Sequence, residues 1–219
     1  MIKGVDISHF QGDIQWQVVK DAGFDFVFMK ATQNIHADPT FTKHWNYLNL
    51  KDFGIIKSAY HFFDTSADPT KQAEAFCFVV GTLKDSDLPL VVDIEEDQTK
   101  GALSLEDRIK NLQTFLDYVE KTSGKKPIIY TNRPFFKEYF QDSTIFKDYL
   151  LWFSAYPDPK TFQPSDPPPD HTFLPFCAWD TFTIWQYTEA GTIPGADNAG
   201  NTFDFNVFPG NLDDLKALC

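Results

Sequence analysis

Basic side chains are scarce in this chain. Its 219 residues include 19 Lys and Arg against 31 Asp and Glu, for a formal net charge of −12. Proteins that bind nucleic acid or anionic lipid headgroups need clustered Lys and Arg to contact phosphate. The sequence also lacks any run of about 18 apolar residues, the length that a membrane-spanning helix requires. We therefore expect neither a nucleic acid nor a membrane among its partners.

Cysteine is scarce as well, with only Cys77, Cys177 and Cys219. Three cysteines are too few to build a disulfide-stabilised domain. No Cys-x-x-Cys or Cys/His ligand spacing occurs, so we expect no metal site and no cofactor. Cys77 shares a helical face with Ala73 and Val80, which predicts a buried position. A bridge between the other two cysteines is left open.

Apolar and aromatic residues are plentiful, at 42% and 16% of the chain, enough for a large core. Strand-like and helix-like segments alternate, which predicts parallel pairing through right-handed crossovers. Several strand-like segments are continuous apolar runs, typical of strands covered on both faces. The predicted strands are Ile2–Ile7, Phe26–Ala31, Ile56–Phe62, Leu90–Ile94, Ile128–Tyr130, Leu151–Ala155, Thr183–Tyr187 and Phe203–Phe205.

Helix signals are clearest in two segments between these strands. Ser104 and Asp107 form a capping-box pattern ahead of an amphipathic stretch that ends at Gly124. Asp68 and Pro69 open another helix. After the Pro-rich stretch around 167–169, strands follow one another without helical patterns. We therefore predict an α/β fold: an irregular TIM-like barrel of five β/α units followed by three strands with few or no helices, a single domain over 1–219 and a monomer.

Two carboxylates end the predicted fourth strand, in Leu-Pro-Leu-Val-Val-Asp-Ile-Glu. Side chains alternate along a strand, so Asp93 and Glu95 point to the same side, roughly 6–7 Å apart. That spacing allows two acids to flank one scissile bond. Like charges beside an apolar run raise the proton affinity of at least one acid, which favours general-acid cleavage of an acetal. Solvated acids at a strand end are the alternative.

Two more acids lie at predicted strand positions, Asp6 in the first strand and Asp204 in the eighth. The first and eighth strands are neighbours in a closed barrel, so these acids should face each other. Barrel enzymes place their chemistry at the carboxyl ends of the strands. A buried cluster of acids is costly to the fold and therefore suggests function. For Asp6, capping of a following helix is the alternative.

Aromatic and amide side chains recur at the same predicted rim. Sugar rings have apolar faces and hydroxyl edges, so a groove that mixes such side chains suits a polysaccharide. Each residue alone is more typical of a core position, as is His61. The candidates are Tyr60, Tyr130, Asn132, Trp152, Tyr156, Trp185 and Gln186.

Several motifs in order carry a family resemblance. They are Gly-Val-Asp-Ile-Ser-His-Phe-Gln-Gly, Phe-Val-Phe-Met-Lys-Ala-Thr, Asp-Pro-Thr-Phe, Ala-Tyr-His-Phe-Phe, Val-Val-Asp-Ile-Glu, Ile-Trp-Gln-Tyr-Thr and Asp-Phe-Asn. Together they resemble the glycoside hydrolase family 25 muramidases over nearly the whole chain, a family with the same five-plus-three barrel. Where that family usually continues Lys-Ala-Thr with Glu-Gly, this chain has Gln33 and Asn34.

The resemblance implies cleavage of the β-1,4 bond between N-acetylmuramic acid and N-acetylglucosamine in peptidoglycan glycan strands. It implies that Glu95 is the general acid/base, Asp93 its partner, and Asp6 and Asp204 supporting acids. It also implies retention through attack by the substrate's acetamido oxygen; the residues alone do not distinguish this from direct attack by a carboxylate. Gln33 removes one negative charge near these acids, which we expect to lower the pKa of Glu95 or to alter a substrate contact.

Alternatives remain open at this point. A catalytically idle wall-binding barrel, prompted by Gln33, is compatible with the residues. Another glycan hydrolase and a hydrolase that uses the acids to bind a hard cation are compatible with them as well. The chain begins at Met1 without a charged-then-apolar leader. We therefore expect a leaderless lysin or a trimmed secreted enzyme that acts outside the cell or at the cell wall.

Overall fold

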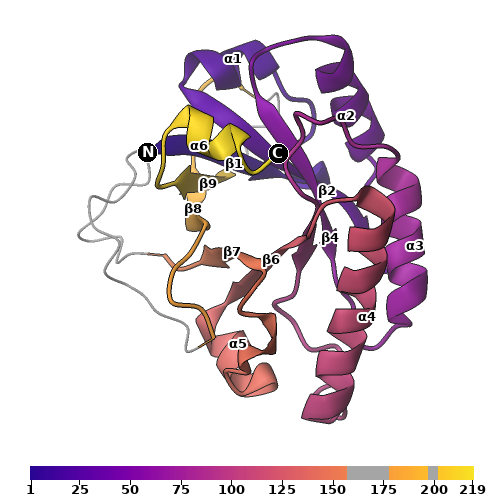
Figure 1. The fold of residues 1–219 in the computed structure, drawn as a ribbon. Helices are drawn as coiled ribbons and strands as arrows, with labels where there is room; N and C mark the ends of the chain where they lie inside the picture. Colours follow the sequence, from indigo (N-terminus) through magenta and orange to yellow (C-terminus); the bar gives the residue numbers. More distant parts are fainter. Residues whose placement is uncertain (157–177, 197–201) are drawn as a thin grey trace.

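A closed β-sheet forms the centre of the molecule (Figure 1). The computed structural model describes residues 1–156, 178–196 and 202–219. The strand order is β1-β9-β8-β7-β6-β5-β4-β2-β3, and an additional β1–β2 pairing closes the barrel. The strands are β1 (Ile2–Ile7), β2 (Phe24–Gln33), β3 (His36–Ala37), β4 (Ile56–Phe62), β5 (Val91–Asp93), β6 (Ile128–Asn132), β7 (Leu150–Ser154), β8 (Ile184–Gly191) and β9 (Phe203–Phe208).

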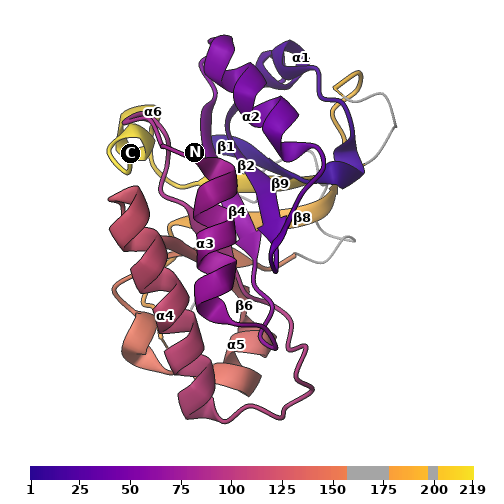
Figure 2. The same ribbon diagram turned by 90° about the vertical axis from the view of Figure 1, so that its right-hand side faces the viewer.

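Helices cover the outside of this sheet, with α2, α3 and α4 along one side (Figure 2). Ser104 caps α4 by accepting a hydrogen bond from the Asp107 amide, and the helix ends at Gly124 with a φ of 75°. Asp68 caps α3 in the same way, so both predicted helix starts are confirmed. The helices are α1 (Trp16–Asp21), α2 (Phe41–Leu50), α3 (Pro69–Val80), α4 (Leu105–Ser123), α5 (Arg133–Phe140) and α6 (Leu212–Lys216), with 3-10 turns η1 (His9–Gln11) and η2 (Thr144–Phe146).

The predicted irregular barrel is confirmed, including its helix-poor last third. Within 150–156, 178–196 and 202–208 the structure describes strands and turns but no α-helix. All eight predicted strands are present, and Ile2–Ile7 and Ile56–Phe62 match β1 and β4 at both ends. Among the strands of the described residues, only the short β3, which pairs antiparallel with the end of β2, was not predicted.

The eighth barrel strand, β9, departs from parallel pairing. It runs antiparallel to both β1 and β8, whereas β1, β2, β4, β5, β6, β7 and β8 pair in parallel. The beginning of β9 therefore lies at the rim where the parallel strands end. This reversal brings Asp204, the second residue of β9, opposite Asp6 near the end of β1.

Side chains alternate between two hydrophobic layers. Along β2, Val27 and Met29 join the larger cluster that also contains residues of the covering helices, while Phe26 and Phe28 join a smaller cluster inside the barrel. Gly4 of β1 makes room for this inner cluster, because a Cβ atom there would lie 2.2 Å from the Phe26 ring. The smaller cluster therefore fills the barrel beneath its rim.

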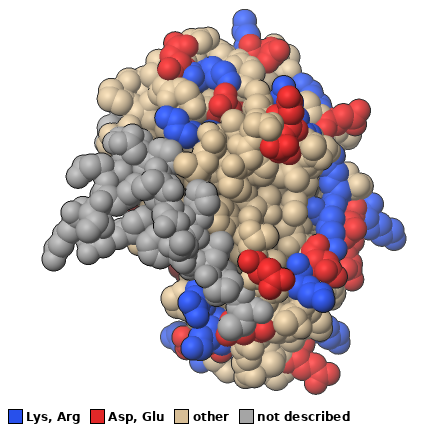
Figure 3. Space-filling model, turned by 60° about the vertical axis from the view of Figure 1, so that its left-hand side comes forward, with Lys and Arg blue, Asp and Glu red and all other residues tan. Residues whose placement is uncertain are grey.

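The structure also places two of the cysteines and shows how charge is distributed over one face of the surface. Cys77 is partly buried against the larger cluster, and Cys177 lies outside the described residues, so the bridge to Cys219 stays untested. None of the described helices is long and apolar enough to cross a bilayer. On the face in Figure 3, Lys and Arg side chains are interspersed with Asp and Glu around a largely uncharged centre.

Candidate active site

Asp6 lies at the mouth of the barrel and is 5% exposed. Its Oδ2 accepts hydrogen bonds from Gln186 Nε2 at 2.9 Å and from Asn206 Nδ2 at 2.7 Å. Asp204 pairs with Asp6 across the β1–β9 ladder. Two strands that are far apart in sequence therefore hold this acid pair, as predicted from barrel closure.

The two amides that contact Asp6 are themselves oriented by aromatic side chains. Trp152 Nε1 donates to Asn206 Oδ1 at 2.7 Å. The Tyr156 hydroxyl donates to Gln186 Oε1 at 2.8 Å, and the Tyr130 hydroxyl lies within hydrogen-bond distance of the same atom, also at 2.8 Å. Because each amide oxygen is occupied as an acceptor, each NH₂ group must face the carboxylate. Neighbouring rings thus determine which atoms the acid meets.

Both acids of the Asp6–Asp204 pair have raised pKa values. Burial and the neighbouring Asp204 raise the pKa of Asp6 well above its usual range, although the two amide donors oppose this. Burial raises the pKa of Asp204 to about 6. Two carboxyl groups that share one desolvated site cannot both ionise easily. The pair therefore retains a proton at pH values where free aspartates have lost theirs.

Asp93 and Glu95 stand at the end of β5. Asp93 is 6% exposed, and its Oδ1 has no hydrogen-bond partner among the described residues. Burial first and then Glu95 raise the pKa of Asp93, while the Lys30 ammonium opposes the shift. Burial first and then Glu96 raise the pKa of Glu95. An acid with a raised pKa holds its proton to a higher pH than a free carboxyl group and can therefore act as a general acid.

Two residues of β6 contact the Glu95 carboxyl. Hydrogen bonds from Asn132 and Tyr130 to this group partly offset the rise in its pKa. Asn132 Oδ1 is already used to cap α5, because it accepts from the Phe135 amide at 2.9 Å. Its NH₂ group is therefore the donor to Glu95. Tyr130 has one hydroxyl proton, so it donates to Glu95 or to Gln186, but not to both at once.

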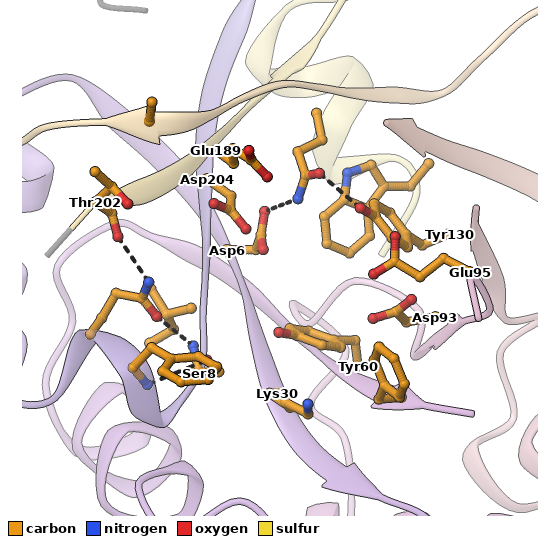
Figure 4. A pocket seen from close by; sticks show the side chains of 17 residues that line it. Asp6, Ser8, Lys30, Tyr60, Asp93, Glu95, Tyr130, Glu189, Thr202 and Asp204 are labelled. Atoms are coloured by element: carbon orange, nitrogen blue, oxygen red, sulfur yellow. Dashed lines mark hydrogen bonds between the residues drawn. The ribbon is translucent and has the colours of Figure 1, made fainter. Parts of the chain in front are cut away.

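These acids line one cavity of about 530 Å³ at the mouth of the barrel, which we call the first pocket. Figure 4 shows Asp93 and Glu95 on one side and Asp6, Asp204 and Glu189 on the other, with Tyr60 below. Both aromatic rings and carboxyl groups line it. The lining residues are Asp6, Ile7, Ser8, Phe10, Gln11, Lys30, Tyr60, Phe62, Asp93, Glu95, Tyr130, Trp152, Gln186, Glu189, Ala190, Thr202 and Asp204.

The segment that carries Glu95 is anchored two residues further on. Asp97 forms a two-pronged ion pair with Arg108 of α4, at 3.0 and 3.1 Å. Thr65, from the loop after β4, donates its hydroxyl to Asp97 at 3.0 Å. The Asp97 and Arg108 side chains are only 1% and 4% exposed. This buried ion pair holds the loop after β5 against α4.

Most of the predicted site residues meet at the first pocket, but four do not line it. Asn132 and Tyr156 stand just behind it, through their contacts with Glu95 and Gln186. Gln33 lines a neighbouring cavity. Trp185 was assigned to the wrong face of its strand. It is 1% exposed and belongs to the larger cluster, and its Nε1 donates to the Ala155 carbonyl at 2.7 Å.

Sequence reasoning missed other residues of this site. Asn206 lies two positions after Asp204, and strand alternation could have placed both on one face. Lys30 continues the inward stripe of Phe26 and Phe28, so a lone Lys in an apolar strand was a usable signal. The structure also places His61 as expected, buried between Thr32 and Gln72. Among the described residues, no group of three or more His, Cys, Asp or Glu is arranged to hold a metal ion.

Known proteins resemble this chain in sequence and in fold. The chain is 32% identical over 223 residues to the uncharacterized protein YegX of Escherichia coli K12, covering 99% of this chain and 73% of that protein. It is 29% identical to lysozyme M1 of Streptomyces globisporus, covering 99% and 71%. The crystal structure of a bacterial lysozyme from Streptomyces coelicolor superposes with a TM-score of 0.84 at 27% identity, covering 99% of this chain and 96% of that one.

A family 25 glycosyl hydrolase structure from Bacillus anthracis superposes with a TM-score of 0.81 at 29% identity, covering 99% of this chain and 93% of that one. The model of the family described as "Glycosyl hydrolases family 25" matches residues 5–196. That range contains Asp6, Asp93 and Glu95 and nearly the whole barrel. The chain belongs to glycosyl hydrolase family 25.

Proposed function

We propose that this protein is a muramidase that hydrolyses the β-1,4 bond between N-acetylmuramic acid and N-acetylglucosamine in peptidoglycan. The observation that supports this most strongly is the first pocket, where Asp93 and Glu95 face the Asp6–Asp204 pair. All four carboxyl groups have raised pKa values. Aromatic rings of the same pocket suit the apolar faces of sugars. This substrate places the reaction at the cell wall.

In the first step Glu95 acts as the general acid. It gives its proton to the glycosidic oxygen while the C1–O bond breaks. The oxygen of the substrate's own 2-acetamido group attacks C1 from the other face, which forms a cyclic oxazolinium intermediate. The acetamido N–H donates to Asp93, whose Oδ1 has no partner among the described residues. The carboxylate stabilises the positive charge that develops on this group.

In the second step the roles reverse at Glu95. The carboxylate takes a proton from water as the water oxygen attacks C1 and the oxazolinium ring opens. The sugar keeps its anomeric configuration because C1 is attacked twice. Asn132 keeps the Glu95 carboxyl oriented throughout, because its own carbonyl is fixed by α5. The Asp6 pair adjoins this centre, held by Gln186 and Asn206.

The test is digestion of purified peptidoglycan with mass analysis of the borohydride-reduced products. Wild-type protein should release fragments with a new muramic-acid reducing end. Glu95→Gln, which keeps shape and most hydrogen bonds, should lower kcat by about 10²–10⁴-fold. Its circular dichroism spectrum and thermal transition should match those of the wild type. Near-normal release by this variant would refute the role given to Glu95.

The same assay separates the competing functions. New glucosamine reducing ends would indicate a different glycosidase, and free peptides without new reducing ends would indicate an amidase. Tight binding to walls without soluble fragments would indicate an idle binding barrel. Gln33, the residue that prompted that alternative, hydrogen-bonds Lys30 at 2.9 Å and does not line the first pocket.

A further inference from the structure

A second cavity of about 420 Å³ adjoins the first pocket, and Lys30 lines both. We call it the second pocket. A ligand bound at the acids can therefore extend past one side chain into it. Figure 4 shows Lys30 beside Tyr60 at the edge of the first pocket. The residues that line the second pocket are His9, Lys30, Gln33, Asn34, His36, Ala37, Asp38, Pro39 and Asp64.

The two pockets differ in the chemistry of their walls. The first contains Phe, Tyr and Trp rings, whereas none of the nine described residues that line the second is Phe, Tyr or Trp. Its walls are amides, imidazoles, an ammonium, two carboxylates and small apolar groups. Sugar rings are commonly held against aromatic faces. The second pocket therefore suits a polar, non-carbohydrate extension of a glycan better than another sugar.

Both carboxylates of the second pocket are already engaged by protein donors. Asp38 accepts from the amide and Nδ1 of His9 and from the amide and hydroxyl of Thr40. Asp64 accepts from Asn34 Nδ2 at 2.9 Å and from Ser66. These carboxylates therefore have little capacity to bind a ligand's donors. The remaining groups, Lys30, Gln33 and His36, are mainly donors and favour a ligand rich in acceptors.

The hydrogen-bond partner of Lys30 is a neutral amide, so it does not cancel the charge of the ammonium. Its Nζ donates to Gln33 Oε1 at 2.9 Å and lies 4.7 Å from the centre of the Phe62 ring. An ammonium has three donors, and an amide oxygen uses one without cancelling the charge. Burial lowers the pKa of Lys30, while Asp93 and Asp38 on its two sides favour the protonated form. A glutamate at position 33 would neutralise this cation.

We propose that the second pocket binds the acidic peptide attached to the muramic acid residues of peptidoglycan, and that Lys30 and Gln33 select for its carboxylates. The inference rests on the proposed function, since the glycan that the first pocket binds delivers its attached peptide to this one. A stem peptide offers free carboxylates and amide carbonyls, which match the donors that remain. Gln33 thereby becomes a specificity residue.

The first experiment compares two substrates that differ only in the peptide. Wild-type kcat/KM should be higher on glycan strands that carry stem peptides than on strands stripped of them by an amidase. Gln33→Glu should reduce the ratio of these two values about tenfold, because the new anion pairs with Lys30 and repels the peptide carboxylate. Asn46→Asp, on an exposed face of α2 outside both pockets, adds the same charge and should leave the ratio unchanged.

The second experiment measures binding without catalysis. A synthetic stem tetrapeptide, titrated into isotope-labelled protein, should shift the amide signals of Gln33, Asn34 and His36. The same peptide with its carboxylates converted to carboxamides should shift them much less. Shifts confined to other surfaces, or equal shifts with both peptides, would overturn the assignment.

The two proposals fail in different ways. If the wild type cleaves neither substrate, the muramidase proposal fails, and the peptide titration still tests the second pocket. If it cleaves both substrates equally and Gln33→Glu changes both equally, the peptide subsite is refuted while the muramidase proposal stands.

Discussion

Three of the four carboxylates at positions 93–97, at the end of β5 and just after it, differ in the direction of their pKa shifts. Asp93 and Glu95 face the first pocket without a paired cation, and burial raises the pKa of each. Asp97 is as deeply buried at its side chain, and burial alone would raise its pKa too. Hydrogen bonds from Arg108 and Thr99 outweigh that effect and lower the pKa of Asp97 instead. A few ångströms of chain thus separate a reactive acid from a structural one.

The opposite end of the barrel contains a second buried acid that is paired with a cation. Asp87 pairs with Lys57 there, and the two side chains are only 4% and 5% exposed. Lys57 also lies 4.1 Å from the centre of the Trp45 ring. A buried acid with a dedicated cation contributes little reactivity, because its charge is satisfied. The acids of the first pocket lack this pairing, so their burial destabilises the fold and raises the pKa of each.

The largest effect should come from breaking the structural ion pair. Arg108→Gln leaves Asp97 as a buried, uncompensated charge, so the free energy of unfolding should fall by about 3–5 kcal/mol. Urea denaturation followed by fluorescence measures this. Adding Asp97→Asn in the same chain should recover part of the loss. A loss below about 1 kcal/mol would mean that the ion pair does not anchor the loop.

Neutralising a reactive acid should have the opposite effect on stability. Asp93→Asn removes a buried carboxylate that has no paired cation. Because burial disfavours its charged form, the melting temperature should stay equal or rise. The same change should lower kcat by about 10²–10³-fold, because the acetamido group loses its charged partner. A stable variant with unchanged kcat would contradict the role given to Asp93. A destabilised variant would show that this acid supports the fold.

A smaller effect concerns pH and Asp204. Its folded pKa of about 6 exceeds the usual value, so the folded state binds the proton more tightly than the unfolded state. The stabilisation is present below pH ~4 and is lost as the pH rises toward ~6. Between these limits the unfolding free energy of the wild type should fall by about 1–2 kcal/mol more than that of Asp204→Asn. Parallel urea titrations across this pH range would show it, and identical slopes would argue against the assignment.

The smallest effect should follow removal of metal ions. Among the described residues no group of three or more His, Cys, Asp or Glu is arranged to hold a metal ion, and the proposed steps use none, so digestion of peptidoglycan in excess chelator should proceed at the full rate. Activity that is lost in chelator and restored by added Mg²⁺ or Ca²⁺ would instead assign the acid cluster to metal binding.

Local sequence patterns were sufficient for much of the fold. Capping at Ser104 and Asp68 determines where α4 and α3 begin, because these contacts join residues two or three positions apart. Strand positions followed from apolar runs, and closure of the barrel placed Asp6 beside Asp204. Short-range hydrogen bonds and period-two alternation are properties of the chain itself, so they could be predicted from the sequence.

The face of each strand could not be predicted in the same way. Strands of this barrel are buried on both sides, so alternation separates two faces without saying which is inward. Trp185 and its neighbour Gln186 were both assigned to the rim. Only Gln186 lies there, because adjacent residues of a strand point to opposite faces. The antiparallel direction of β9 was likewise not predicted, because strand direction depends on connections rather than on composition.

By itself, the sequence determined the eight-strand barrel, the helix starts and the four acids, since each rests on neighbouring residues or on family motifs. Only the tertiary structure decided what surrounds those acids. The donors to Asp6, the cation beside Asp93 and the arginine on Asp97 come from positions 11 to 200 residues away in the chain. Burial and charge pairing set the pKa of a carboxyl group, and both depend on distant residues that only the fold brings together.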